Sequence, residues 1–193
     1  MRINTPMIRV ERLHELLRYD VESGLLYWKV RRNQLALEGA VAGHIDNCRV
    51  KLYYRVRVDR QLVMGHWIVW AMHYGHWPDD QIDHQDGNGI NNRISNLRIA
   101  TQAVNNKNAA VRKDNKTGVS GVTTVRSGRY VAHIREGGRA MHLGTFDTLH
   151  EASEVRKQAE IRFGFHPNHG RLSDERLIAE TVSKVLDGEA IVA

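Results

Sequence analysis

The sequence predicts an α+β protein in which small antiparallel sheets alternate with helices. Residues 49–59 alternate between apolar and polar side chains, which is typical of a half-buried strand. Residues 82–110 have the pattern of a strand, a long polar loop, a second strand and a short helix, and residues 120–163 that of three short strands and a helix. We therefore expect four parts: a basic β-rich region at 1–60, a core at 61–115, a sheet-plus-helix domain at 116–166 and a C-terminal helix at 167–193.

The composition favours a polyanionic partner. The 193 residues carry a formal net charge of +6, and the sequence pI is about 9.7. Residues 1–60 hold 12 Lys and Arg against 7 Asp and Glu. Cys48 is the single cysteine, so there is no disulfide framework. No apolar run approaches the roughly 18 residues of a membrane span, and we expect a soluble, cytoplasmic protein without a membrane partner.

The basic region begins with a predicted helix over residues 7–19, whose apolar residues share one face. In the strand predicted at residues 49–59, one face is apolar and the other lacks acidic residues until Asp59. We expect the polar face to contact DNA phosphates, although a solvated face of an antiparallel sheet would give the same pattern. The predicted DNA-binding residues of this strand are Arg49, Lys51, Arg55 and Arg57.

A helix is predicted over residues 66–74, ahead of the polar core. Three histidines lie in or just after it: His66, His73 and His76. Each could be a metal ligand, but a surface or capping role is the expectation for all three.

The central stretch combines an Asp-His pair with many asparagines, although Asn is unfavourable in helices and strands. His84 can accept a proton from water near neutral pH. A hard cation such as Mg²⁺ takes oxygen ligands and needs only one or two from protein, which Asp83 and Asn105 could supply. Asn96 could hold the His84 ring by accepting its other N–H. This combination suits phosphodiester hydrolysis.

These residues resemble the HNH endonuclease motif, in the form found in phage and intron-encoded homing nucleases. The resemblance covers about residues 65–113 and implies a ββα-metal core that cuts double-stranded DNA at a recognised site. It assigns His84 as the general base, Asn96 as its support, and Asp83 with Asn105 as ligands of one divalent ion. The ion is expected to be Mg²⁺, with Mn²⁺ as a substitute.

Two other functions are compatible with the same sequence. One is a DNA-binding regulator whose HNH-derived core no longer cuts. The other is a structural or protein-binding module in which the asparagines only form turns. The target sequence, and whether one strand or both are cut, stay open.

The sheet-plus-helix domain has landmarks at Gly121-Val122, at residues 130–135, at residues 143–148 and at Glu151-Ala152. They resemble the ethylene-response-factor (APETALA-type) DNA-binding domain over about residues 117–165. The resemblance implies that the open face of the sheet enters the major groove. The plant pattern has arginines where Thr123 and Val125 stand, so its base preference is not carried over. The predicted DNA-binding residues are Arg129, His133, Arg135, Arg139 and His142.

The last predicted helix, at residues 173–186, is acidic and is expected to pack on the body or on a second copy of the chain. A monomer and a homodimer are both possible, and a bacterial or phage-infected cell is the expected setting.

Overall fold

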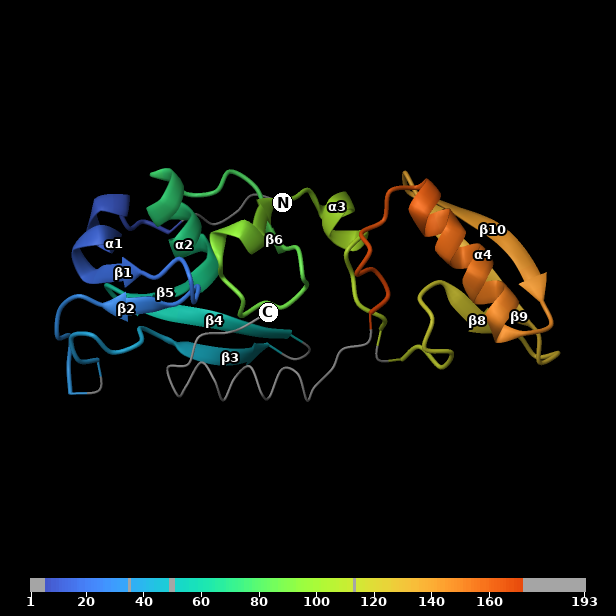
Figure 1. Cartoon of the computed structure of the whole chain (residues 1–193), viewed down its shortest axis with the longest axis horizontal. Coiled ribbons are helices and arrows are strands. Elements are labelled where there is room, and N and C mark those ends of the chain that lie inside the picture. The colour runs from blue at the N-terminus through green and yellow to red at the C-terminus, as the bar shows by residue number, and fades with distance from the viewer. Residues whose placement is uncertain (1–5, 35, 49–50, 113, 172–193) are drawn as a thin grey trace. The chain divides into compact units, whose positions relative to one another are not determined.

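A computed structural model describes residues 6–34, 36–48, 51–112 and 114–171 (Figure 1). They divide into two compact units, one ending at Thr101 and the other starting at Gln102. Each unit contains a three-stranded antiparallel sheet with helices, which confirms the mixed α+β class. The helix predicted at residues 173–186 lies outside the described residues. None of the helices in the described part of the chain has the length and apolar character needed to cross a bilayer.

The first unit is built on a sheet with the strand order β3-β4-β5. Its strands are β3 (His44–Cys48), β4 (Lys51–Val58) and β5 (Gln61–Met64). The predicted alternation is confirmed over the described part of β4, where Tyr54, Val56 and Val58 are buried. The turn into β5 has positive φ angles at Asp59 (42°) and Arg60 (71°), as a type I′ hairpin turn requires.

The N-terminal helix is shorter than predicted. α1 (Val10–Leu16) ends where the backbone becomes extended, and β1 (Leu17–Tyr19) pairs with β2 (Leu26–Trp28). The turn between these strands is closed by Asp20, whose Oδ1 accepts from the backbone N–H groups of Glu22 and Ser23. The prediction of a helix over residues 7–19 was therefore wrong at both ends, because turn formation and strand pairing override the apolar stripe.

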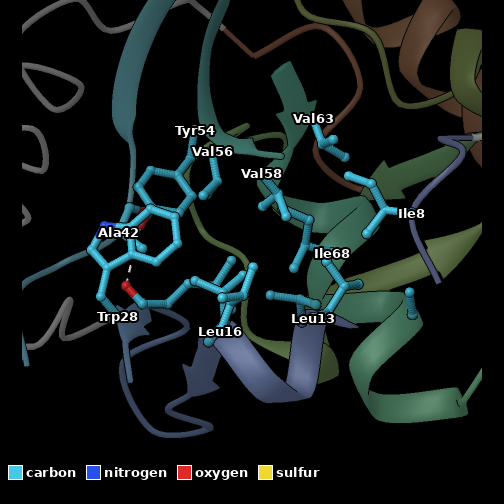
Figure 2. Close-up of a cluster of buried hydrophobic side chains, with 14 of the residues drawn as sticks. Ile8, Leu13, Leu16, Trp28, Ala42, Tyr54, Val56, Val58, Val63 and Ile68 are labelled. Atoms are coloured by element: carbon cyan, nitrogen blue, oxygen red, sulfur yellow. Dashed lines mark hydrogen bonds between the residues drawn. The ribbon is translucent and has the colours of Figure 1, made fainter. Parts of the chain in front are cut away.

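α2 (Gly65–Tyr74) follows β5 directly and confirms the helix predicted there. Its buried residues Ile68, Val69 and Ala71 pack into one core with α1 and the sheet (Figure 2). That core also contains Ile8, Leu13, Leu16, Trp28, Ala42, Tyr54, Val56, Val58 and Val63. Burial of one large apolar side chain contributes about 1.5–3 kcal/mol. The cluster therefore gives α2 and β4 a rigid support.

The strand, loop and strand predicted for the polar core are confirmed. β6 (Ile82–His84) pairs antiparallel with β7 (Leu97–Ile99), and the 3₁₀ helix η1 (Ile94–Asn96) leads into β7. Ile82 and Leu97 are buried and join the core of the first unit.

α3 (Gln102–Asn106) opens the second unit and is shorter than the helix predicted up to residue 110. Asn108, two residues after α3 ends, is a poor helix former. The Lys107 carbonyl accepts instead from the backbone N–H of His166, and Gly170 N–H donates to the Ala109 carbonyl. Pairing with the end of the unit thus replaces the last turn of the predicted helix.

The second unit confirms the predicted architecture of three strands and one helix. The strands β8 (Val122–Thr124), β9 (Tyr130–Glu136) and β10 (Arg139–Phe146) form a sheet in the order β10-β9-β8. α4 (Leu149–Arg162) packs on one face of it through a core of Val122, Ala132 and Ala152. Buried Arg156 closes this interface, because its Nε donates to the Ser120 carbonyl and its Nη2 pairs with Glu160 Oε1 at 3.0 Å.

We expect Thr148→Ala to lower the free energy of unfolding by about 0.5–2 kcal/mol, the usual cost of losing an N-cap. Thr148 and Glu151 form a reciprocal capping box at the start of α4. Denaturant unfolding monitored by circular dichroism measures the change, and Ser127→Ala in the exposed β8–β9 turn is the control. Equal stability of both variants would show that the cap does not stabilise α4.

Candidate active site

The β6–β7 hairpin positions the Asp-His pair of the first unit. In its register, Asp83 lies opposite Arg98 and His84 opposite Leu97. All three residues of β6 are buried, with exposed fractions of 7% for Asp83 and 5% for His84. An ionisable pair this deep needs polar partners, because an unpaired buried polar group is destabilising.

Asp83 has a cationic partner in Arg98. Both Nε and Nη2 of Arg98 donate to Oδ2 of Asp83, at 3.1 and 2.8 Å. The guanidinium is partly exposed whereas the carboxylate is nearly buried. The pair therefore offsets the negative charge at the end of β6.

Several asparagines of the central stretch hold the loop at residues 85–96 in its conformation. Asp86 is its centre: its carboxylate accepts from the side-chain amides of Asn91 at 2.7 Å and Asn96 at 2.9 Å. The backbone N–H of Asn88 also donates to Asp86, at 2.8 Å. These side chains satisfy polar groups that a strand or helix would otherwise pair, so the loop is held in one conformation.

The predicted contact between Asn96 and His84 was wrong. The Asn96 side chain bonds instead to Asp86 and to the Asn91 carbonyl, and its Oδ1 accepts from the backbone N–H of Asp86 at 3.0 Å. The amide that reaches the imidazole belongs to Asn92, whose Oδ1 lies 3.0 Å from His84 Nε2. Asn96 therefore closes the base of the loop, and a neighbour in the same Asn-rich run takes the predicted contact.

His66 is a second residue whose position was predicted wrongly. It is buried rather than superficial, and its ring meets the ring of His84 edge-on with 4.9 Å between centroids. Burial lowers the pKa of His66 well below its usual value, and the nearby His84 lowers it further. The spacing gives a signal for this burial, because His66 lies three residues before buried Val69 on α2. The surface positions predicted for His73 and His76 are confirmed.

Tyr53, on the polar face of β4, lies close to His84 and His66. Its ring centroid lies 6.4 Å from that of His84 and 5.9 Å from that of His66. A Cβ on Gly89 would lie 3.0 Å from the Tyr53 ring, so the 85–96 loop packs directly on this strand. The polar face of β4 is thus partly the wall of the site rather than wholly an open surface.

The two predicted metal ligands belong to different units of the fold. Asp83 supplies a carboxylate, and Asn105, the second predicted ligand, lies half-buried on α3 in the other unit. Among the described residues, no three or more His, Cys, Asp or Glu side chains gather as a metal cage. A carboxylate and an amide oxygen are ligand types that Mg²⁺ accepts, and their binding of one ion stays a prediction.

The predicted DNA-binding residues of β4 have different surroundings. Arg57 is exposed, and Arg55 is half-buried and pairs with Asp46 of β3 at 3.2 Å. The polar face of β4 has no acidic residue of its own before Asp59, but the adjacent strand supplies one, and DNA contact by this face stays a prediction. Arg49 lies outside the described residues, and of Lys51 only its place at the start of β4 is described.

The predicted residues on the second sheet are all exposed. His133 of β9 lies directly opposite His142 of β10, and Arg135 lies opposite Ala140. The buried residues Ala132 and Ile134 alternate with them, so the exposed side chains share the face away from α4. The two remaining residues are Arg139 at the start of β10 and Arg129, which pairs with Asp147 at 2.7 Å.

The family comparison covers the residues that form this site. Residues 63–107 match the HNH endonuclease family. The matched stretch contains the HNH residues predicted from the sequence, from Asp83 to Asn105, and it supports a nuclease that acts on DNA. No curated protein and no solved structure matches the chain. The resemblance of residues 117–165 to the ethylene-response-factor domain has no support from these comparisons.

Proposed function

We propose that this protein is a metal-dependent endonuclease that hydrolyses double-stranded DNA at a recognised site. The observation that carries the proposal is the buried His84 within the HNH match, beside a carboxylate that is paired with Arg98. An imidazole held among polar groups at the end of a strand is suited to accept a proton from water.

In the proposed reaction His84 takes a proton from a water molecule while the water oxygen bonds to phosphorus. The phosphorus–O3′ bond breaks, which leaves a 5′-phosphate and a 3′-hydroxyl that takes its proton from solvent. Asp83 and Asn105 would hold one divalent ion, Mg²⁺ or Mn²⁺, which supplies charge stabilisation to the phosphate when bound. Asn96 acts on the reaction only through the loop whose base it closes.

For site recognition we propose the exposed face of the second sheet. It presents Arg135, His133 and His142 at positions that alternate with buried residues, and Arg139 is exposed at the start of β10, opposite Glu136 in the register. A sheet face that carries arginines can enter a major groove and contact phosphates or guanine edges. The likeness to the ethylene-response-factor domain and to homing nucleases supports this assignment, with the chain acting as a monomer or a homodimer.

The test is cleavage of a supercoiled plasmid by the full chain with Mg²⁺ or Mn²⁺, and with a chelator as control. We expect nicked or linear DNA that carries 5′-phosphates only when the metal is present. Salt-sensitive DNA binding without cleavage at any metal concentration would instead indicate the inactive regulator. Absence of binding even at low salt would indicate the structural or protein-binding module.

We expect the double variant Arg135→Ala/Arg139→Ala to reduce the salt dependence of DNA binding. Each lost phosphate contact lowers the slope of log K against log salt by about 0.9. Fluorescence anisotropy with random-sequence duplexes in a chelator measures the slope without cleavage. Arg162→Ala/Lys157→Ala on α4 removes the same charge from exposed positions of the helix. If both double variants changed the slope equally, the second sheet would not be the binding surface.

A further inference from the structure

Asn92 is the most deeply buried polar residue of the site, with an exposed fraction of 1%. Its Oδ1 lies 3.0 Å from His84 Nε2. An amide oxygen only accepts hydrogen bonds, so this contact is a hydrogen bond in the tautomer that carries the proton on Nε2. In the neutral ring the lone pair is then on Nδ1, which becomes the atom that can take a proton from water.

The backbone around Asn92 is fixed by the N-terminal part of the unit. The Tyr19 hydroxyl donates to the Asn92 carbonyl at 3.2 Å and accepts from the backbone N–H of Ile94 at 3.0 Å. A Cβ on Gly24 would lie 2.7 Å from the Arg93 nitrogen, closer than real Cβ contacts, so the β1–β2 turn packs against this backbone. The position of Asn92 is thus set by a hairpin far from it in sequence.

The side-chain amide is confined as well. A Cβ on Gly65 would lie 3.0 Å from Asn92 Nδ2 and 2.4 Å from the Tyr54 ring, so only glycine lets α2 begin this close to the amide. His66, the next residue, packs its ring edge-on against His84. Asn92 and the imidazole therefore have neighbours that leave each ring and amide little room to rotate.

Two polar atoms in this cluster have no partner in the part of the chain that the structure describes: Asn92 Nδ2 and His66 Nδ1. An unsatisfied buried donor or acceptor is destabilising, so an apolar side chain in either position would give a more stable core. A purely structural role does not explain an amide that leaves its own N–H₂ without an acceptor. Orientation of the imidazole does explain it, because that role uses only the oxygen.

We propose that Asn92 is the positioning residue of the active site and holds His84 in the tautomer with the proton on Nε2. The buried ring of His66 packs edge-on against the His84 ring and restricts its rotation away from the Asn92 amide. The importance of this arrangement for cleavage rests on the proposed nuclease function, but the tautomer itself can be measured without DNA or metal.

The primary test is nuclear magnetic resonance of the full chain labelled with ¹⁵N-histidine, at a pH where the His84 ring is neutral. We expect an exchange-protected Nε2–H resonance and an unprotonated Nδ1 for His84. Asn92→Ala should remove the protection, whereas Asn92→Asp keeps an oxygen acceptor in the same place and should retain it. A parent protein with the proton on Nδ1, or with an unprotected Nε2–H, overturns the proposal without any variant.

The matched control is Asn91→Ala, in the next residue along the same loop. The Asn91 side chain bonds to Asp86 and Arg93 rather than to His84, so its removal loosens the loop without touching the ring. The Nε2–H should stay protected in this variant. Equal loss of protection in Asn91→Ala and Asn92→Ala would assign the effect to loop integrity and overturn the proposal.

A kinetic readout separates positioning from substrate binding. If the protein cuts DNA, Asn92→Ala should lower kcat by about 10–100-fold, as loss of a residue that orients a functional side chain does, and leave KM nearly unchanged. Asn92→Asp should recover most of the loss. A lower kcat that Asn92→Asp does not recover, together with an unchanged tautomer, contradicts the proposal.

Discussion

His84→Ala should reduce the rate of DNA cleavage by about 10²–10⁴-fold, the usual contribution of a general base. The variant removes the imidazole that we propose takes the proton from water. The loss belongs to the chemical step, so DNA affinity measured in a chelator should not change. Single-turnover cleavage of a plasmid with Mn²⁺ at saturating protein measures the rate.

The control for this variant is His73→Ala. His73 lies on the exposed side of α2, so it shares the residue type and the supporting helix but not the site. It should cut at the parental rate. Cutting by His84→Ala at the parental rate would remove His84 from the mechanism, and a circular dichroism spectrum identical to that of the parent would exclude misfolding as the reason for a loss.

The sequence predicts the elements that carry the site because their signals are local. β6 and β7 follow from short apolar runs bounded by turn residues, and α2 follows from apolar spacing between β5 and Gly75. The match to the HNH family covers Asp83, His84 and the asparagines up to Asn106. Elements whose signals lie within a short stretch of sequence are therefore well predicted.

The side-chain contacts within the site cannot be predicted from short stretches of sequence. Asn92 and Asn96 lie in the same polar loop, and which of them meets His84 depends on the path that Asp86 imposes on the backbone. The burial of His66 depends on where α2 lies on the sheet. Sequence spacing identifies the candidates, and only the three-dimensional packing selects among them.

The same limit applies to charge. The polar face of β4 has no acidic residue of its own near Arg55, yet β3 lies next to β4 and brings Asp46 within 3.2 Å of it. A strand read alone shows its own two faces but not the side chains of its neighbours. The second sheet is the better DNA-binding candidate because all its predicted residues are exposed in the folded unit, whereas Arg55 of β4 is half-buried.

Asp83→Asn should lower metal-dependent cleavage by about 100-fold or more, because transition-state stabilisation by a bound ion amounts to several kcal/mol. The amide keeps the shape of the carboxylate and an acceptor for Arg98, but it removes the charge that attracts a divalent cation. The partly exposed guanidinium of Arg98 can reach water, so we expect the variant to stay folded.

Metal binding distinguishes this prediction from a loss of structure. Binding of Mn²⁺ to the parent in the absence of DNA, followed by electron paramagnetic resonance, should weaken strongly in Asp83→Asn and remain unchanged in Asp79→Asn, an exposed carboxylate ahead of β6. Bound metal stabilises only the folded chain, so saturating Mn²⁺ at about 100 times its Kd should add about 2.7 kcal/mol to the stability of the parent. An equal gain in Asp83→Asn would place the ion elsewhere, and the pairing of Asp83 with Arg98 would then be structural.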